Sequence, residues 1–225
     1  KYRDEARPRA GLIRVREFTM KDGYSSHPDQ ACLDAYYERA HEAYVRIFKR
    51  IGLKDVLSIE SDSGMMGGAV AHEFMAIADC GEDTIFMSPG GEYLANRDIA
   101  RTALTYKPGE PLSLEKVHTP GKTSIAEVAE FLNVSASETG KAVFYTDADG
   151  ELVFVVIRGD LDVNETKLRN ALNTSALAFA DDAQIQAVGA EPGYASPMQI
   201  DPERCRIVFD PSARDTSNLA VGANE

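Results

Sequence analysis

The sequence predicts an α+β fold in which two structural units follow one another along the chain. Strand-like and helix-like segments are mixed without the strict alternation of a doubly wound parallel sheet. Residues 106–123 gather prolines and glycines and are the best candidate for a linker. A chain of 225 residues is long enough for two small domains. We therefore expect one unit over residues 1–107 and a second over residues 108–225.

The first unit is predicted to begin with two short strands, over residues 2–24, that flank a basic loop. Apolar side chains at helical spacing then predict a helix over residues 29–50 with one buried face. Pro28 and Asp29 suit its first turn, and Gly52 suits its end. We then expect a strand at 56–60, a glycine-rich stretch at 63–68, strands at 72–78 and 84–87, and a helix at 93–102.

The second unit is predicted to open with a helix over residues 125–132, with Thr123 or Ser124 as its N-cap. Two β-rich runs follow, joined by an Asp-Gly pair typical of a hairpin turn. The remaining elements are a helix and a short strand. The expected ranges are 142–146 and 152–158 for the hairpin, 163–172 for the helix and 207–209 for the strand.

The charge of the chain is unevenly distributed. The formal net charge is −12, which argues against a protein that coats nucleic acid. Residues 1–21 nevertheless hold seven basic and three acidic side chains, a balance of +4, so the rest carries −16. A basic segment in an otherwise acidic chain indicates one localised site for phosphate groups. The alternative is a run of charged side chains that only contact water.

Cysteine content and hydropathy indicate the cell compartment in which we expect the protein. The three cysteines are isolated, without metal-ligand spacing or a disulfide framework, so we expect no metal site and a reducing cytoplasm. No apolar run approaches the roughly 20 residues that span a bilayer. We expect a cytoplasmic protein that binds neither membrane nor DNA.

The first candidate site lies in the basic segment. An arginine on a strand, such as Arg3, offers a rigid fork of donors to a phosphate. Phe18 could stack on a nucleotide base, Glu5 could accept from an exocyclic amine, and Arg14 could neutralise phosphate. From the residues alone, a hairpin with surface salt bridges is the simpler interpretation.

The sequence of this segment resembles motif 2 of bacterial-type prolyl-tRNA synthetases, a family of class II synthetases. The general elements are Arg-x-Glu at 3–5 and a later Phe-x-x-x-Asp at 18–22, and the family-specific ones are Arg-Pro-Arg at 7–9 and Arg-Glu-Phe-x-Met-Lys-Asp at 16–22. Gly67-Gly68, His72-Glu73-Phe74, Ser88, Tyr93 and Ala95-Asn96 are similar to the catalytic domain of the same family.

The resemblance continues into the second unit, which looks like the YbaK-like editing domain that this family inserts between motifs 2 and 3. The matching stretches are Thr119-Pro120, Lys122-Thr123, Lys141, Arg158-Gly159-Asp160, Gly193-x-x-x-Pro197 and Gly222-Ala223-Asn224. The chain departs from the family at Ser26, at Leu161, where a histidine is frequent, and in the absence of a His-Tyr pair after Asn224.

For the first unit, the resemblance implies a piece of an antiparallel class II catalytic domain that uses ATP and Mg²⁺. Arg3 would bind the α-phosphate of ATP, Phe18 would stack on adenine, Glu5 would orient it, and Arg14 would add positive charge. His72 and Phe74 would line the proline pocket, although a lone histidine beside a phenylalanine is more often structural.

For the second unit, the resemblance implies hydrolytic editing. Lys141 would hold the terminal phosphate or ribose of tRNA, or position the ester for attack by water. Gly193 and Pro197 would belong to the loop that approaches the aminoacyl group, or else form an ordinary turn. Asp160 is assigned to the editing site as well, more readily as the N-cap of the 163–172 helix than as a general base.

The function implied is that of a prolyl-tRNA synthetase: ATP-dependent activation of L-proline, transfer to tRNA(Pro), and clearance of Ala-tRNA(Pro). The parent enzyme would be a homodimer, and we expect this chain alone not to aminoacylate. Two alternatives remain open, a stand-alone deacylase that edits in trans and a non-catalytic module that binds tRNA.

Overall fold

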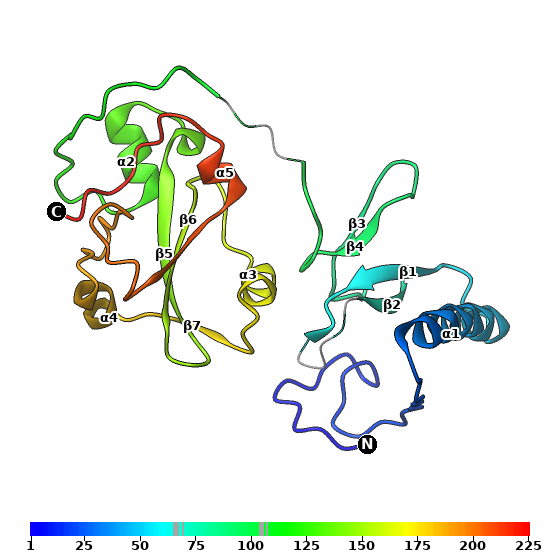
Figure 1. Ribbon diagram of the computed structural model, residues 1–225. Helices are drawn as coiled ribbons and strands as arrows, with labels where there is room; N and C mark the ends of the chain where they lie inside the picture. The colour runs from blue at the N-terminus through cyan, green and yellow to red at the C-terminus, as the bar shows by residue number, and fades with distance from the viewer. Residues whose placement is uncertain (65–67, 69, 104–105, 107) are drawn as a thin grey trace. The chain divides into compact units, whose positions relative to one another are not determined.

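The computed structural model describes residues 1–64, 68, 70–103, 106 and 108–225 (Figure 1). The chain separates into two units, Lys1–Ala100 and Arg101–Glu225, and we describe each by itself. Part of the glycine-rich stretch predicted at 63–68 lies outside the described residues. The assignment of residues 1–107 to a catalytic domain and of 108–225 to an editing domain remains a prediction.

The first unit begins with an irregular hairpin. Isolated bridges join Tyr2 to Glu17 and Arg9 to Arg14, so the two predicted strands are reduced to single pairs. Helix α1 (Gln30–Arg50) follows, with Asp29 as its N-cap, as the sequence indicates. Its predicted face is only half-buried: Tyr37, Tyr44 and Phe48 are partly covered, and no residue of α1 is buried.

A four-stranded sheet of order β2-β1-β4-β3 completes this unit. Its strands are β1 (Val56–Ser61), β2 (Ala71–Ala76), β3 (Ile85–Met87) and β4 (Leu94–Asn96). The helix predicted over residues 93–102 is wrong, because this segment forms β4, which pairs in parallel with β1 at Ala95 and Glu60. Ile59 and Ala95 are fully buried at this junction.

The second unit is built on a sheet of order β7-β5-β6-β8. The predicted hairpin forms β5 (Gly140–Asp147) and β6 (Leu152–Arg158), with Gly150 at φ +83° in the turn. The outer strands are β7 (Leu177–Phe179) and β8 (Arg206–Phe209). Strand β6 is buried on both faces, as its continuous apolar run indicates.

Helices and loops cover both faces of this sheet (Figure 1). On one face, Val153 and Val155 pack with Leu168 of α3 (Glu165–Leu172). On the other, Phe154 packs with Cys205 and with Ala213 of α5 (Pro211–Arg214). The remaining elements are α2 (Ile125–Leu132), the short helix η2 (Ala136–Glu138) and α4 (Asp182–Ala187).

The N-cap residues explain where α2 and α3 begin, and they correct the role predicted for Asp160. Ser124 caps α2 in a capping box with Glu127, as predicted. The cap of α3 is Asn164, whose side chain accepts from the Lys167 N–H. Asp160 is therefore not the helix cap, because α3 begins at Glu165, two residues later than predicted, and Asp160 pairs with Arg158 instead.

Among the described residues, no helix is long and apolar enough to cross a membrane.

Candidate functional site

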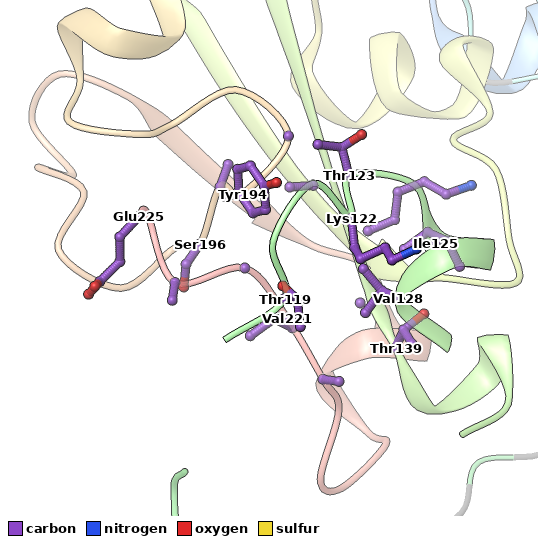
Figure 2. A pocket seen from close by; sticks show the side chains of 18 of the residues that line it. Thr119, Lys122, Thr123, Ile125, Val128, Thr139, Tyr194, Ser196, Val221 and Glu225 are labelled. Atoms are coloured by element: carbon purple, nitrogen blue, oxygen red, sulfur yellow. The ribbon is translucent and has the colours of Figure 1, made fainter. Parts of the chain in front are cut away.

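The second unit contains a cavity of about 1060 Å³. Its floor comes from the start of β5, where Thr139 and Phe144 are buried and Lys141 is half-buried. The other walls come from α2, from the loop at 192–199, from the C-terminal residues 219–225 and from residues 114–124. Figure 2 shows how side chains from these walls surround the cavity, including those of Thr119, Ile125, Val128, Tyr194, Ser196 and Val221.

The predicted editing lysine lies in this cavity. Lys141 Nζ donates to the Leu161 carbonyl oxygen at 2.7 Å and to Asp162 Oδ1 at 2.8 Å. The Lys141 side chain is 27% exposed, whereas that of Asp162 is 96% exposed and fully solvated. An ammonium carries three donors, so these two bonds leave one donor for a ligand in the cavity.

Gly193 also lines the cavity, and its conformation explains why a glycine stands there. Its φ is +82°, which disfavours any residue with a Cβ. A Cβ at this position would lie only 3.0 Å from Thr123 Cγ2. The glycine therefore lets the 192–199 loop close against the residues that precede α2.

The C-terminal residues hold the same loop from the other side. Asn224 Oδ1 accepts from the Ser196 N–H at 2.8 Å, and Asn224 Nδ2 donates to the carbonyl oxygens of Ser196 at 3.2 Å and Met198 at 2.6 Å. A Cβ on Gly222 would come within 2.2 Å of the Tyr194 carbonyl oxygen. The Gly-Ala-Asn stretch thus packs backbone to backbone on the loop that begins at Gly193.

Two predicted editing residues are not among the described residues that line the cavity, namely Pro197 and Asp160. Arg158 holds Asp160 in a two-pronged pair, with Nε to Oδ1 at 2.6 Å and Nη2 to Oδ2 at 2.9 Å. The Arg158 hydrogen bonds lower the pKa of the Asp160 carboxyl. A carboxylate with a lowered pKa is a weak proton acceptor, which disfavours a general-base role.

In the first unit, the structure brings the predicted ATP residues together on the N-terminal hairpin. The Arg3 guanidinium lies over the Phe18 ring, 5.2 Å from its centroid. Glu5 accepts from the Arg7 N–H at 2.8 Å and from Arg14 Nε at 3.0 Å. The Arg7 backbone donor, followed by Arg14, lowers the pKa of Glu5.

A further carboxylate, which the sequence did not single out, completes this network. Glu82 accepts from Arg9 Nε at 2.7 Å and from Arg14 Nη1 at 2.8 Å. Arg9, followed by Arg14, lowers the pKa of Glu82. The salt-bridged hairpin that we weighed from the residues alone is therefore present, and it engages Arg14, one of the two arginines assigned to phosphate binding, together with Arg9.

His72 and Phe74, the predicted proline-pocket residues, belong to an aromatic cluster between β2 and α1. His72 Nδ1 lies 2.8 Å from the Tyr37 hydroxyl. The Phe74 ring packs on those of His41, Tyr44 and Phe48, with centroids 5.2 to 5.6 Å apart. These contacts give both residues a packing role, and a contact with proline remains a prediction.

Comparisons with known proteins give the following similarities. Residues 118–225, which include most of the residues that line the cavity, match the aminoacyl-tRNA editing domain family. Over its whole length, the chain is 46% identical to a proline--tRNA ligase of Dehalococcoides mccartyi strain 195 and 43% identical to one of Fusobacterium nucleatum. It spans only 39% and 40% of these two relatives. The resemblance to prolyl-tRNA synthetases stated from the sequence is confirmed.

Among solved structures, the chain is similar to a protein described as a candidate trans-editing enzyme for prolyl tRNA synthetase. The identity is 13% and the TM-score 0.37, over 42% of this chain and 59% of that one.

Proposed function

We propose that the chain is part of a proline--tRNA ligase whose second unit hydrolyses tRNA(Pro) mischarged with alanine. The observation that carries this proposal is the position of Lys141, a cation on the wall of a cavity within the residues that match the editing-domain family. Similarity to proline--tRNA ligases over the whole chain favours this function over a stand-alone deacylase or a simple tRNA-binding module.

The need for editing follows from size. A pocket that accepts proline cannot strongly reject alanine, because missing methylene groups contribute only about 1–3 kcal/mol of discrimination. A second site that admits the alanyl ester and hydrolyses it removes the error. Water adds to the ester carbonyl, the bond to the ribose oxygen breaks, and alanine and tRNA are released.

Lys141 can support this reaction as a fixed positive charge. Its two hydrogen bonds orient the ammonium, and the remaining donor can reach an oxygen of the terminal phosphate, the ribose or the ester. A charge that is oriented before the substrate binds needs little reorganisation during the reaction. Gly193 would shape the part of the cavity nearest Thr123, where the loop approaches without a side chain.

The first unit would take part in activation of L-proline by ATP. This unit offers the two guanidinium groups of Arg3 and Arg14 and the aromatic face of the half-buried Phe18. Such groups fit a nucleoside triphosphate. The described residues hold no cluster of three His, Cys, Asp or Glu placed for a metal, so Mg²⁺ would arrive on the ATP phosphates. The homodimer and tRNA(Pro) as a partner belong to the same proposal.

The editing proposal is tested by incubating this chain with Ala-tRNA(Pro) and Pro-tRNA(Pro) and following release of the amino acid. The chain should hydrolyse the alanyl ester selectively, and Lys141→Ala should slow it by about a hundredfold or more. Asp162→Ala removes only the exposed partner of Lys141 and should keep most of the activity. Equal hydrolysis of both esters, or full activity in Lys141→Ala, would contradict the proposal.

The activation proposal needs a chain extended to the length of the relatives. There, Arg3→Ala should lower proline-dependent ATP–pyrophosphate exchange by about a hundredfold. Arg39→Ala, an exposed substitution on α1, is the control and should leave exchange unchanged. Unaltered exchange in Arg3→Ala would remove Arg3 from the ATP site.

A further inference from the structure

Residues 109–119, which the sequence suggested as part of a linker, run along the second unit as one wall of its cavity. We call this segment the strap. Its residues Leu114 to Thr119 line the cavity, and Figure 2 shows Thr119 among the lining side chains. A linker between domains would be expected to contact few residues of either domain. The strap instead makes specific hydrogen bonds, so its position needs a structural cause.

Asn218 supplies that cause. Its Oδ1 accepts from the Leu112 N–H at 2.9 Å, and its Nδ2 donates to the Glu110 carbonyl oxygen at 3.0 Å. The neighbouring Ser217 hydroxyl accepts from the Gly109 N–H at 3.2 Å. One amide side chain thus replaces the strand partner that the strap lacks.

Asn218 itself is held in a constrained conformation. Its φ is +59°, in the left-handed region that asparagine tolerates better than most residues. Two residues further on, the Ala220 carbonyl oxygen accepts from the Gly140 N–H at the start of β5 at 2.8 Å, and the Ala220 N–H donates to the Glu138 carbonyl oxygen of η2 at 2.9 Å. The strap is therefore tied through Asn218 to the cavity floor that carries Lys141.

The strap differs from the floor in exposure and in size of side chain. Leu114 is 81% exposed and Val117 is 52% exposed, whereas Thr139 of the floor and Ser196 of the 192–199 wall are fully buried. An alanyl group has only a methyl side chain, and a cavity of about 1060 Å³ far exceeds it. The small aminoacyl group fits the buried floor beside Lys141, which leaves the wide, exposed part of the cavity for the nucleoside that carries it.

We propose that the strap is the wall on which the 3′-terminal nucleoside of the tRNA lies, and that Asn218 is the positioning residue that holds this wall in place. The inference rests on the proposed editing function and adds a subsite to it. The apolar side chains of Leu114 and Val117 offer a surface for a base. His118 offers a polar group to its edges, and Lys116, whose ammonium pairs with Glu225, has further donors for a phosphate.

The test separates binding from chemistry. Asn218→Gly keeps the left-handed backbone and removes both side-chain hydrogen bonds. It should raise KM for Ala-tRNA(Pro) by about tenfold and leave kcat within about twofold. Asn218→Asp retains the acceptor for the Leu112 N–H and should raise KM less. Leu114→Ala leaves the Asn218 bonds intact and should also raise KM.

Asn173→Gly is the matched control, because Asn173 has φ +56° at the end of α3 and is not among the described residues that line the cavity. It should leave KM unchanged. An unchanged KM in Asn218→Gly, or a fall in kcat alone, would overturn the role of Asn218.

Binding of adenosine 5′-monophosphate, followed by NMR shifts of the Leu114 and Val117 amides, gives a readout that needs no hydrolysis. The nucleotide should shift both amides in the wild-type chain and bind about tenfold more weakly to Asn218→Gly. Absence of these shifts would overturn the nucleoside wall. Loss of hydrolysis with the shifts retained would instead count against the proposed editing activity.

Discussion

The two units differ in how they fix their candidate functional residues in space. In the second unit, β6 is covered on both faces, and the cavity walls are joined to its neighbour β5 by backbone hydrogen bonds. In the first unit, α1 has no buried residue, and the arginines assigned to ATP lie on an irregular hairpin. A pocket needs fixed walls, and among the described residues the cavity with the predicted lysine on its surface lies in the second unit.

The charged side chains of the two units also differ in the kind of partner that binds them. The carboxylates of Glu5 and Glu82 hold Arg9 and Arg14 by side-chain pairs at a solvated surface. Lys141, which is more covered, is oriented by a backbone carbonyl as well as by Asp162. Surface pairs are weak and screened by salt, whereas a backbone acceptor cannot rotate away. The stability of the second unit should therefore depend on packing, and the stability of the first unit on pH and salt.

The largest effect is expected at Gly222, where backbone carbonyl oxygens of another loop occupy the space that a Cβ would need. In Gly222→Ala, the new Cβ would meet the carbonyl oxygens of Tyr194 and Ala195 at 2.2 and 2.3 Å, and these backbone atoms cannot rotate away. We expect a loss of about 3 kcal/mol in the free energy of unfolding of the second unit, measured in urea.

The control for this substitution is Gly150→Ala. Gly150 has φ +83°, but no atom lies within 4 Å of the place that a Cβ would take, so only backbone strain of about 1 kcal/mol is expected. Equal losses at the two glycines would show that the close approach at Gly222 is not what stabilises the loop.

A smaller loss is expected from Asn224→Gly. Glycine keeps the backbone conformation at φ +62° but removes three hydrogen bonds to Ser196 and Met198. The Ser196 N–H belongs to a fully buried residue, so its unpaired donor should cost about 2 kcal/mol of unfolding free energy. A loss within error of zero would mean that Gly-Ala-Asn does not hold the 192–199 loop.

The smallest effect is expected in the first unit and depends on pH. Glu5 and Glu82 have folded pKa values lowered from the ordinary 4.5 by their arginine and backbone donors. A lowered pKa means that their stabilisation is present above pH 4.5 and is lost as the pH falls through the folded values. Carboxyl NMR titrations should show both groups titrating below 4.5, and Arg14→Gln should return Glu5 toward that value only in part, because the Arg7 N–H donor remains.

This prediction would be contradicted if both carboxyls titrated at their ordinary pKa, because the network of Glu5 and Glu82 with Arg9 and Arg14 would then be absent in solution. High salt should weaken the network, because its members are exposed.

Local patterns predicted the elements whose causes are local. Helix α1 follows from apolar spacing and the Asp29 cap, and the β5–β6 hairpin follows from two apolar runs around Gly150. Strand β4 was mistaken for a helix because its structure comes from pairing with two other strands, β3 and β1, of which β1 lies more than thirty residues earlier in the chain. The start of α3 was misplaced because an aspartate in Arg-Gly-Asp can pair with its own arginine instead of capping a helix.

The candidate site shows the same limit. Lys141 and Gly193 were found from their resemblance to a family, and the structure places both at one cavity. The strap was mistaken for a linker because proline and glycine also occur in ordered segments that lack secondary structure. Asn218 carries no pattern in the sequence, because its partners Glu110 and Leu112 lie more than a hundred residues away.

The measurement that tests the account most directly is the ratio of the initial rates at which this chain hydrolyses Ala-tRNA(Pro) and Pro-tRNA(Pro). We expect the alanyl ester to be cleaved at least about tenfold faster, since a site that rejects the larger side chain discriminates by steric exclusion. A ratio near one, or faster release of proline, would contradict the assignment of the Lys141 cavity to editing.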